Sequence, residues 1–254
     1  MTKTAVVTGG GSHIGAAITQ ALARDGFDVF VTYIAEMAEC AGVVAAVEAM
    51  GRKITAVQCD AGYKAQVDAL YRQVSEVAGA PDVLVNNAGV QTWSSLLDLE
   101  EADWDRVIRT NLKGCFLNTQ AAARLMVATG RGGRIVNIGS GCNRIAFPNL
   151  VDYTASKGGI EMFTKVSAVE LGQYNITVNC IAPGAIETVR TQQEAPDYAG
   201  GWAKITPLGR VGYPSDVADA VMLLVDARAG FITGQTINSD GGVFNKPNWP
   251  PYPE

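Results

Sequence analysis

Tyr153 and Lys157 stand four residues apart in the segment from Asp152 to Gly159. If this segment is helical, the two side chains rise from one face on successive turns. A phenol is a poor acid near neutral pH, with an unperturbed pKa of about 10, and a nearby ammonium group favours the phenolate. The pair therefore suits proton transfer to or from a substrate, although this spacing also occurs by chance in many helices.

A glycine cluster lies near the N-terminus, where Gly9, Gly10, Gly11 and Gly15 separate a predicted strand from a predicted helix. Glycines at such a junction let the backbone turn tightly and approach a pyrophosphate, which then sits on the helix N-terminus. A glycine cluster can also be only a turn. Its place at the first strand–helix junction favours a nucleotide site.

The elements that must position these residues alternate between short β-branched segments and longer helical patterns. Strands are expected at Thr4–Thr8, Asp28–Tyr33, Ile54–Gln58, Val83–Asn86, Arg134–Ile138, Thr177–Ile181 and Thr236–Asn238. Helices are expected near Ile14–Arg24, Met37–Met50, Ala65–Val77, Asp103–Ala128, Asp152–Leu171 and Ser215–Val225. The alternation, with strands that are apolar on both faces, predicts an α/β fold. We expect a doubly wound parallel sheet (Rossmann fold) of about seven strands with helices on both faces.

Composition favours one domain over residues 1–254, because 254 residues with 48% hydrophobic content can form one large core and no linker divides them. The formal net charge of −5 gives no electrostatic reason to expect nucleic acid or an anionic membrane as a partner. The chain runs directly into a predicted strand, and no uncharged apolar run reaches the roughly 18 residues of a membrane helix. We therefore expect a cytoplasmic protein.

The cysteines are scattered and odd in number, and none forms a Cys-x-x-Cys motif: they are Cys40, Cys59, Cys115, Cys142 and Cys180. This pattern argues for reduced thiols rather than a disulfide framework, and we expect no metal site. Four of them stand in apolar surroundings and suit core packing. Cys142, close to Ser140, is interpreted as lining a substrate pocket.

In order along most of the chain, these motifs resemble the short-chain dehydrogenase/reductase family. The family loop Thr-Gly-x-x-x-Gly-x-Gly matches the segment from Thr8 to Gly15, except that His13 replaces the middle glycine. Tyr153 and Lys157 match the family's Tyr-x-x-x-Lys pair. Ser140, thirteen residues before Tyr153, matches its serine, and Asn111 matches its helix asparagine. The resemblance implies that these four residues are catalytic.

The resemblance also implies a nicotinamide dinucleotide as cofactor. The residues at the matching cofactor positions are Gly9, Gly11, Ser12, His13, Ile14, Gly15, Tyr33, Asp60, Ala61, Asn87, Ala88, Gly89, Tyr153, Lys157, Pro183, Gly184, Ile186 and Thr188. Tyr33 stands where relatives that use NAD usually carry Asp. Relatives that use NADP often have Arg at the positions of Ser12 or Ile34, and neither is basic here. Because the Asp is missing, we expect NADP rather than NAD.

For the reaction, the resemblance implies interconversion of a ketone or aldehyde with an alcohol. Ser140 and Tyr153 would donate hydrogen bonds to the carbonyl oxygen while a hydride passes to its carbon and Tyr153 gives up its proton. Lys157 would hold the ribose next to the nicotinamide, and Asn111 would hold a water that connects Lys157 to solvent. The expected substrate contacts are Trp93, Ser140, Cys142, Phe147 and Val189, with a mobile lid over residues 188–206.

Two alternatives remain open. Relatives that reduce a 3-oxoacyl group on a carrier protein have a basic residue at the end of the catalytic helix, where this chain has Tyr174, although Arg131 and Arg134 stand nearby. A non-catalytic nucleotide-binding regulator with the same fold is the second alternative. Such regulators typically lose the Tyr or the Lys, and both are present here.

Family relatives are commonly homotetramers, so we expect one here, with a small-molecule carbonyl or alcohol as the other partner. Apolar faces in the segments Ala121–Met126 and Gly158–Leu171 could pack against copies of themselves. The chain ends in a tail over residues 243–254 that is rich in proline and aromatic residues. We interpret this tail as a segment that reaches across a subunit interface.

Overall fold

The computed structural model describes residues 2–245. Seven strands form one sheet in the order β3-β2-β1-β4-β5-β6-β7, and every neighbouring pair is parallel. The strands are β1 Thr4–Val7, β2 Asp28–Tyr33, β3 Ile54–Gln58, β4 Val83–Asn86, β5 Gly133–Ile138, β6 Ile176–Pro183 and β7 Thr236–Ser239. The predicted doubly wound parallel sheet is confirmed, with strand bounds that differ by a few residues.

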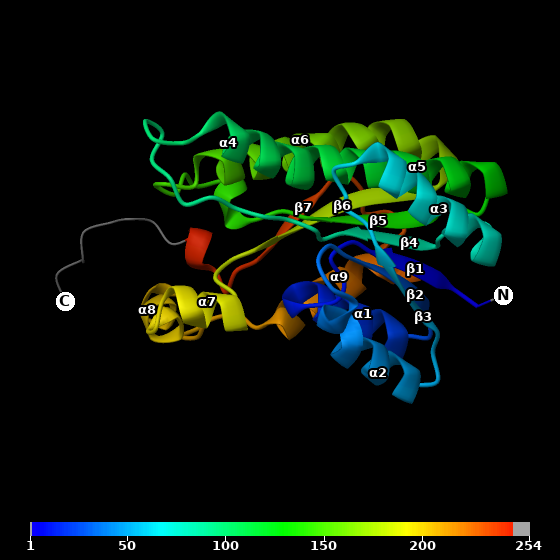
Figure 1. Cartoon of the computed structure of the whole chain (residues 1–254), viewed down its shortest axis with the longest axis horizontal. Helices are drawn as coiled ribbons and strands as arrows, with labels where there is room; N and C mark the ends of the chain where they lie inside the picture. Colours follow the sequence, from blue (N-terminus) through cyan, green and yellow to red (C-terminus); the bar gives the residue numbers. More distant parts are fainter. Residues whose placement is uncertain (1, 246–254) are drawn as a thin grey trace.

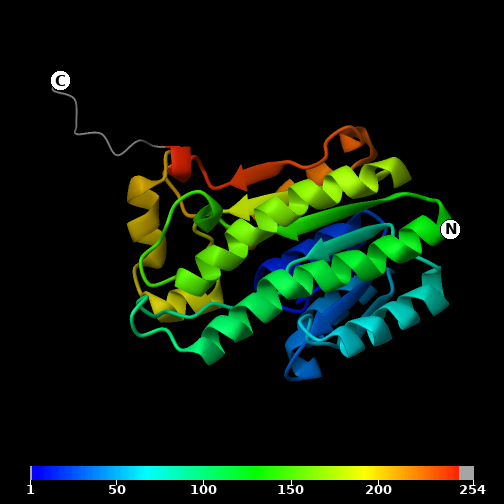
Figure 2. The ribbon, with the colours of Figure 1, turned by 90° about the horizontal axis from the view of Figure 1, so that it is seen from above.

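Helices cover both faces of this sheet (Figure 1). One face carries α1 His13–Arg24, α2 Ala41–Ala49 and α9 Pro214–Val225, and the other carries α3 Lys64–Ala78, α5 Gly114–Thr129 and α6 Val151–Leu171. Figure 2 shows α3, α5 and α6 side by side across their face. All residues of β1, β4 and β6 are buried, since helices cover them on both sides.

Each layer of helices closes its own apolar core against the sheet. Ile18 and Leu22 of α1 pack with Val221 of α9 on one face. Leu70 of α3 and Met126 of α5 pack on the other. These side chains are fully buried, so the two cores fix the positions of the strand ends between them.

Two predicted helices are divided in the structure. The stretch Met37–Met50 is a 3-10 turn, η1 Met37–Cys40, followed by α2. The stretch Asp103–Ala128 begins earlier, as α4 Glu101–Val107, and passes through a π-helical segment, η2 Ile108–Lys113, before α5. A π segment adds a residue to the helical turn, and such segments are frequent at functional sites. Helical periodicity alone shows neither division.

Short helices and loops surround the carboxyl ends of the strands. Here η3 Gly141–Asn143 follows β5, and α7 Val189–Glu194 and α8 Tyr198–Ile205 occupy the expected lid segment after β6. The turn η6 Val243–Asn245 ends the described chain beside them (Figure 1). The remainder of the predicted tail, residues 246–254, lies outside the described residues. The shorter turns η4 Gly172–Tyr174 and η5 Ala227–Ala229 follow α6 and α9.

Within residues 2–245, no helix combines the length and apolar character needed to cross a membrane. The same residues contain no group of three or more His, Cys, Asp or Glu side chains arranged to hold a metal ion. All five cysteines are buried and none is in a disulfide.

Candidate active site

The turn after β1 approaches the N-terminus of α1 so closely that only glycine fits. Gly9 adopts a φ of 61°, and a Cβ at Gly15 would overlap the Gly9 carbonyl oxygen. Thr8 Oγ1 accepts hydrogen bonds from the Asn87 and Ala88 backbone N–H groups at 3.0 Å. Asn87 Nδ2 donates to the carbonyls of Thr8 and Gly9, also at 3.0 Å. The turn after β4 therefore fixes the glycine loop at the N-terminus of α1, where a pyrophosphate can bind.

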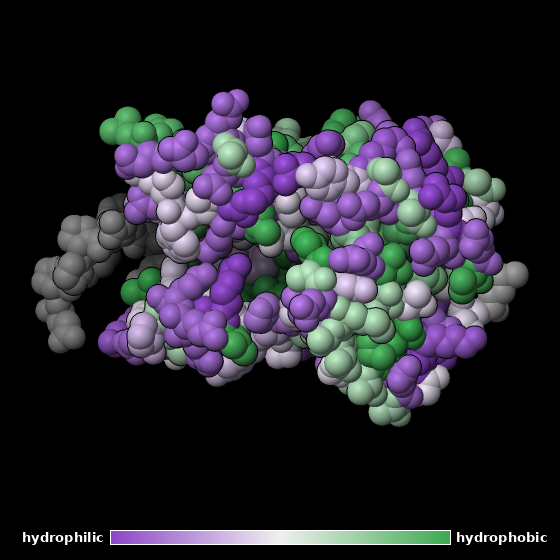
Figure 3. Space-filling view, viewed as in Figure 1, coloured by the Kyte–Doolittle hydropathy of each residue, from purple (hydrophilic) through white to green (hydrophobic). Residues whose placement is uncertain are grey.

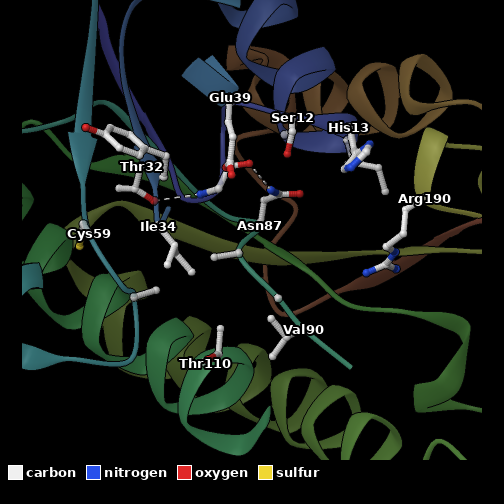
Figure 4. Close-up of a pocket in the computed structure, with 18 of the residues that line it drawn as sticks. Ser12, His13, Thr32, Ile34, Glu39, Cys59, Asn87, Val90, Thr110 and Arg190 are labelled. Atoms are coloured by element: carbon white, nitrogen blue, oxygen red, sulfur yellow. Dashed lines mark hydrogen bonds between the residues drawn. The ribbon is translucent and has the colours of Figure 1, made fainter. Parts of the chain in front are cut away.

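His13 occupies a backbone conformation that favours glycine. Its φ is 48°, in the left-handed region, whereas the preceding Ser12 is extended. This explains why the family loop has glycine at this position. The side chain is exposed and lines the cavity at the glycine loop, beside Ser12 (Figure 4).

Replacement of His13 by Gly should raise the free energy of unfolding by about 1 kcal/mol, because the strain of roughly 1–3 kcal/mol at a non-glycine residue in the left-handed region is partly offset by the greater flexibility of glycine in the unfolded chain. Chemical denaturation measures this difference. Ser12→Gly is the matched control: its extended backbone gains nothing from glycine, so that variant should be no more stable than the wild type. Equal gains in both variants, or a loss in H13G, would contradict the strain at His13.

A cavity lies between the glycine loop, the end of β2 and the turn after β4 (Figure 4). Most of the predicted cofactor residues line it together: Gly9, Gly11, Ser12, His13, Ile14, Gly15, Tyr33, Ala61, Asn87, Ala88, Gly89 and Thr188. The loop accepts no side chain at Gly15 and presents backbone to this cavity, which is what a dinucleotide diphosphate needs. The residues present therefore fit the implied cofactor.

Asp60 is the exception among these residues. It is not part of the cavity lining, and its Oδ1 accepts a hydrogen bond from the Gly62 N–H at 2.9 Å. This hydrogen bond ties one carboxylate oxygen to the turn before α3, and the neighbouring Cys59 and Ala61 line the cavity.

Tyr153, Lys157 and Ser140 line a second cavity, together with Pro183, Gly184 and Ile186. Lys157 is 4% exposed, and its Nζ donates a hydrogen bond to the Ile138 carbonyl at 2.7 Å. The same Nζ lies 5.4 Å from the centroid of the Tyr153 ring. The α6 helix thus brings the predicted pair together, and the ammonium group keeps further N–H donors for a ligand.

Ser140 stands at the carboxyl end of β5, and it caps η3. Its Oγ accepts a hydrogen bond from the Cys142 N–H at 3.2 Å, and a hydroxyl can donate its proton as well as accept. Burial raises the pKa of the Cys142 thiol, so this side chain lines the cavity as a neutral group.

Asn111 lies in the π-helical segment and is fully buried behind the cavity. Its Oδ1 accepts from the Val90 N–H at 2.8 Å, and its Nδ2 donates to the Val90 carbonyl at 2.9 Å and to Ser156 Oγ at 3.0 Å. These bonds join the turn after β4 to α6 one residue before Lys157. The Asn111 side chain thus connects these two elements.

The two cavities share one wall. Ile14, Asn87, Gly89, Val90, Thr188 and Arg190 line both of them. In Figure 3 the surface is hollowed between the part formed by α7 and α8 and the part formed by α1 and α2. A dinucleotide on the glycine loop can therefore extend directly to Ser140, Tyr153 and Lys157.

The predicted substrate contacts agree with the second cavity in four positions out of five. Trp93, Ser140, Cys142 and Phe147 line it, but Val189 does not. Val189 is the first residue of α7 and is 62% exposed, so the helix turns it to solvent. Arg190, the next residue, faces the cavity in its place.

Two further aromatic residues line this wall, Tyr198 within the expected lid segment and Phe244 in the first turn of the tail. Tyr198 of α8 lies 6.2 Å from Trp202, ring centroid to ring centroid, and burial raises the pKa of its phenol to about 12. Phe244 packs on Gly141, where any Cβ would overlap the ring, and its centroid is 6.0 Å from that of Phe147. The first turn of the C-terminal tail thus packs on this chain's own substrate cavity. The sequence of the tail does not predict this contact, because it depends on how the chain after β7 passes the turn after β5.

Comparisons with known proteins agree with this geometry. A family model described as enoyl-(acyl carrier protein) reductase matches residues 9–244. A short-chain dehydrogenase/reductase of Armillaria gallica is 39% identical over 251 residues, which cover 95% of each chain. The 3-oxoacyl-(acyl-carrier-protein) reductase FabG of Staphylococcus aureus is 37% identical, with 96% of this chain and 99% of the reductase covered. The crystal structure of acetoin dehydrogenase from Enterobacter cloacae has a TM-score of 0.90 and 38% identity, and 99% of both chains is covered.

Proposed function

The chain belongs to the short-chain dehydrogenase/reductase family of NAD(P)-dependent oxidoreductases that interconvert carbonyl and alcohol groups, and we propose that Ser140, Tyr153, Lys157 and Asn111 serve this reaction. When bound, the nicotinamide dinucleotide supplies or accepts the hydride. The observation that carries the assignment is the shared wall: the cavity with Ser140, Tyr153 and Lys157 has lining residues in common with the cavity at the glycine loop.

In reduction, Ser140 and Tyr153 donate hydrogen bonds to the substrate carbonyl oxygen and stabilise the charge that develops there. Tyr153 then transfers its hydroxyl proton to that oxygen. The positive charge of Lys157 favours the phenolate that remains, and its spare N–H donors hold the ribose hydroxyls. In oxidation, Tyr153 accepts the proton of the alcohol instead.

Asn111 acts on Tyr153 and Lys157 indirectly. Its hydrogen bonds to Val90 and Ser156 fix the turn after β4 against α6, which keeps Tyr153 and Lys157 in register with the dinucleotide cavity. This positioning role is proposed in addition to the expectation that Asn111 holds a water linking Lys157 to solvent. The amide has its printed partners in the protein itself, and they account for three of its hydrogen bonds.

A substrate panel tests the proposed function. Acetoin and its diketone, simple ketones and their alcohols should be assayed with NADH, NADPH, NAD⁺ and NADP⁺, with nicotinamide absorbance as the readout. Acetoin is included because a related structure is an acetoin dehydrogenase. Turnover with one carbonyl–alcohol pair supports the proposal. Dinucleotide binding without turnover across the panel would favour a non-catalytic regulator.

Reduction of a 3-oxoacyl group on a carrier protein is the second candidate, favoured by the similarity to the Staphylococcus aureus reductase. Against it, Tyr174 occupies the position expected for a basic residue, and Arg131 donates hydrogen bonds to the carbonyls of Ala78 and Ala80. A short β-ketoacyl thioester is the probe. Failure to reduce it would remove this candidate and leave small carbonyl compounds.

For the substrate face, the proposed contacts are Trp93, Phe147, Tyr198 and Phe244, aromatic residues that line the same cavity as Ser140 and Tyr153. We propose that residues 188–206 act as the lid over this cavity, since α7 and α8 carry Arg190 and Tyr198 to it. We also propose that residues 1–254 form one dinucleotide-binding domain and that the protein is cytoplasmic.

We propose a homotetramer as the working form. Phe116 of α5 and Met162, Val166 and Val169 of α6 are exposed apolar side chains on one helical face. Another exposed group, with Phe231 and Ile237, lies at the β7 edge of the sheet. Burial of both groups against other copies would remove this apolar surface from water. Light scattering should give four times the mass of one chain, and the mass of a monomer would contradict the proposal.

A further inference from the structure

The dinucleotide cavity has an uneven distribution of charge. Among its described lining residues, Glu39 and Arg190 are the acidic and the permanently basic side chains, and they lie on opposite sides of the cavity (Figure 4). Arg190 also lines the cavity of Tyr153, which places it toward the nicotinamide. Glu39 accompanies Thr32, Tyr33 and Ile34 at the end of β2, where the adenosine ribose binds in doubly wound folds.

Glu39 is held at this place by its neighbour. Cys40 is fully buried and its Sγ packs directly on Gly11, where a Cβ would overlap the sulfur. Within η1, the Glu39 N–H donates to the Glu36 carbonyl at 3.1 Å. The 3-10 turn that divides the predicted helix thus closes on the glycine loop and presents Glu39 to the cavity.

The Glu39 carboxylate has no protein partner that would occupy it. Among residues 2–245 no hydrogen bond or ion pair involves its side chain, although the carboxylate is near enough to Cys40 to raise the pKa of that thiol, after the larger effect of burial. Arg190 is instead near Glu194, at 3.5 Å. The acceptor oxygens of Glu39 are therefore free for a ligand.

The surrounding segment offers nothing to bind a phosphate on the ribose. Residues 34–39 contain Glu36 and Glu39 and no basic residue. Ser12 and Ile34, which also line the cavity, carry no charge. On the β2 side of the cavity a phosphate at the ribose 2′ position would meet one free carboxylate and neither lysine nor arginine, and like charges brought together in a binding site are strongly unfavourable.

We propose that Glu39 selects NAD over NADP: its carboxylate accepts hydrogen bonds from the hydroxyls of the adenosine ribose and repels a 2′-phosphate. This inference rests on the proposed function and names the cofactor of that same site. It replaces the expectation of NADP, which rested on the absence of Asp at Tyr33. The acidic group comes from η1, six residues beyond Tyr33, rather than from the end of β2 itself.

Calorimetric titration with NAD⁺ and NADP⁺ tests the proposal without any substrate. The wild type should bind NAD⁺ at least about tenfold more tightly than NADP⁺. Glu39→Gln keeps the shape and removes the charge, so it should tighten NADP⁺ binding by about tenfold and weaken NAD⁺ binding by a smaller factor. Glu36→Gln is the matched control, because it removes the same charge from a residue of the same turn that does not line the cavity.

The outcomes separate this inference from the function on which it rests. A wild type that prefers NADP⁺, or an E39Q variant that shifts the ratio of the two affinities no more than E36Q does, would overturn the role of Glu39 alone. In that case, turnover of a carbonyl substrate would still support the proposed function. Binding of neither dinucleotide would overturn both the inference and the proposed function.

Discussion

Replacement of Tyr153 by Phe is expected to lower kcat by about three orders of magnitude, because general acid–base catalysis by a positioned side chain contributes about 10²–10⁴-fold. The ring remains, so its packing and its 5.4 Å approach to Lys157 Nζ are retained. Only the hydroxyl that exchanges a proton with the substrate oxygen is lost. Ser140 still donates one hydrogen bond to that oxygen, which accounts for the residual rate.

The affinity for the dinucleotide separates catalysis from folding in this variant. Calorimetry should give the same dissociation constant for Y153F as for the wild type, since Lys157 and the glycine loop are unchanged. Tyr174→Phe is the control, because it removes the same hydroxyl from an exposed residue beyond the far end of α6 and should keep the wild-type rate. A Y153F rate within tenfold of the wild type would contradict the assignment of Tyr153.

Local patterns in the sequence predict the parts of this site that lie on single elements. Tyr153 and Lys157 are brought together by one helix, so their spacing was sufficient to place them on one face. The glycine loop joins one strand to one helix, and it was recognised for the same reason. Both predictions depend on geometry that spans only a few residues.

Residues that reach the site from elsewhere were not predicted. Glu39 reaches the cavity because Cys40 packs on Gly11, and Phe244 reaches it because the chain after β7 returns to Gly141. These contacts join residues far apart in sequence, so no periodicity marks them. Asp60 and Val189 were proposed from their match to the family, and their local surroundings could not be predicted in that way: the Gly62 N–H donates to the Asp60 carboxylate, and Val189 on α7 is exposed.

Replacement of Gly15 by Ala should abolish the close approach on which the dinucleotide site depends. The new Cβ would overlap the Gly9 carbonyl oxygen and crowd Asn87 Nδ2, which lies 2.7 Å from the Cβ position. Backbone atoms cannot yield as a flexible side chain can, so the loop must shift. We expect the free energy of unfolding to fall by about 2 kcal/mol, the usual cost of overpacking. Because the diphosphate binds on that backbone, dinucleotide affinity should fall by more than about tenfold.

Gly42→Ala is the matched control, since Gly42 is also a glycine in the first turn of a helix but a Cβ there would meet nothing within 4 Å. That variant should gain about 0.5–1 kcal/mol in the free energy of unfolding and keep its dinucleotide affinity. Chemical denaturation and calorimetry on the same samples measure both quantities. If G15A matched G42A in both, the glycine loop would tolerate a side chain at Gly15, and the dinucleotide could not depend on the close approach of α1 to Gly9.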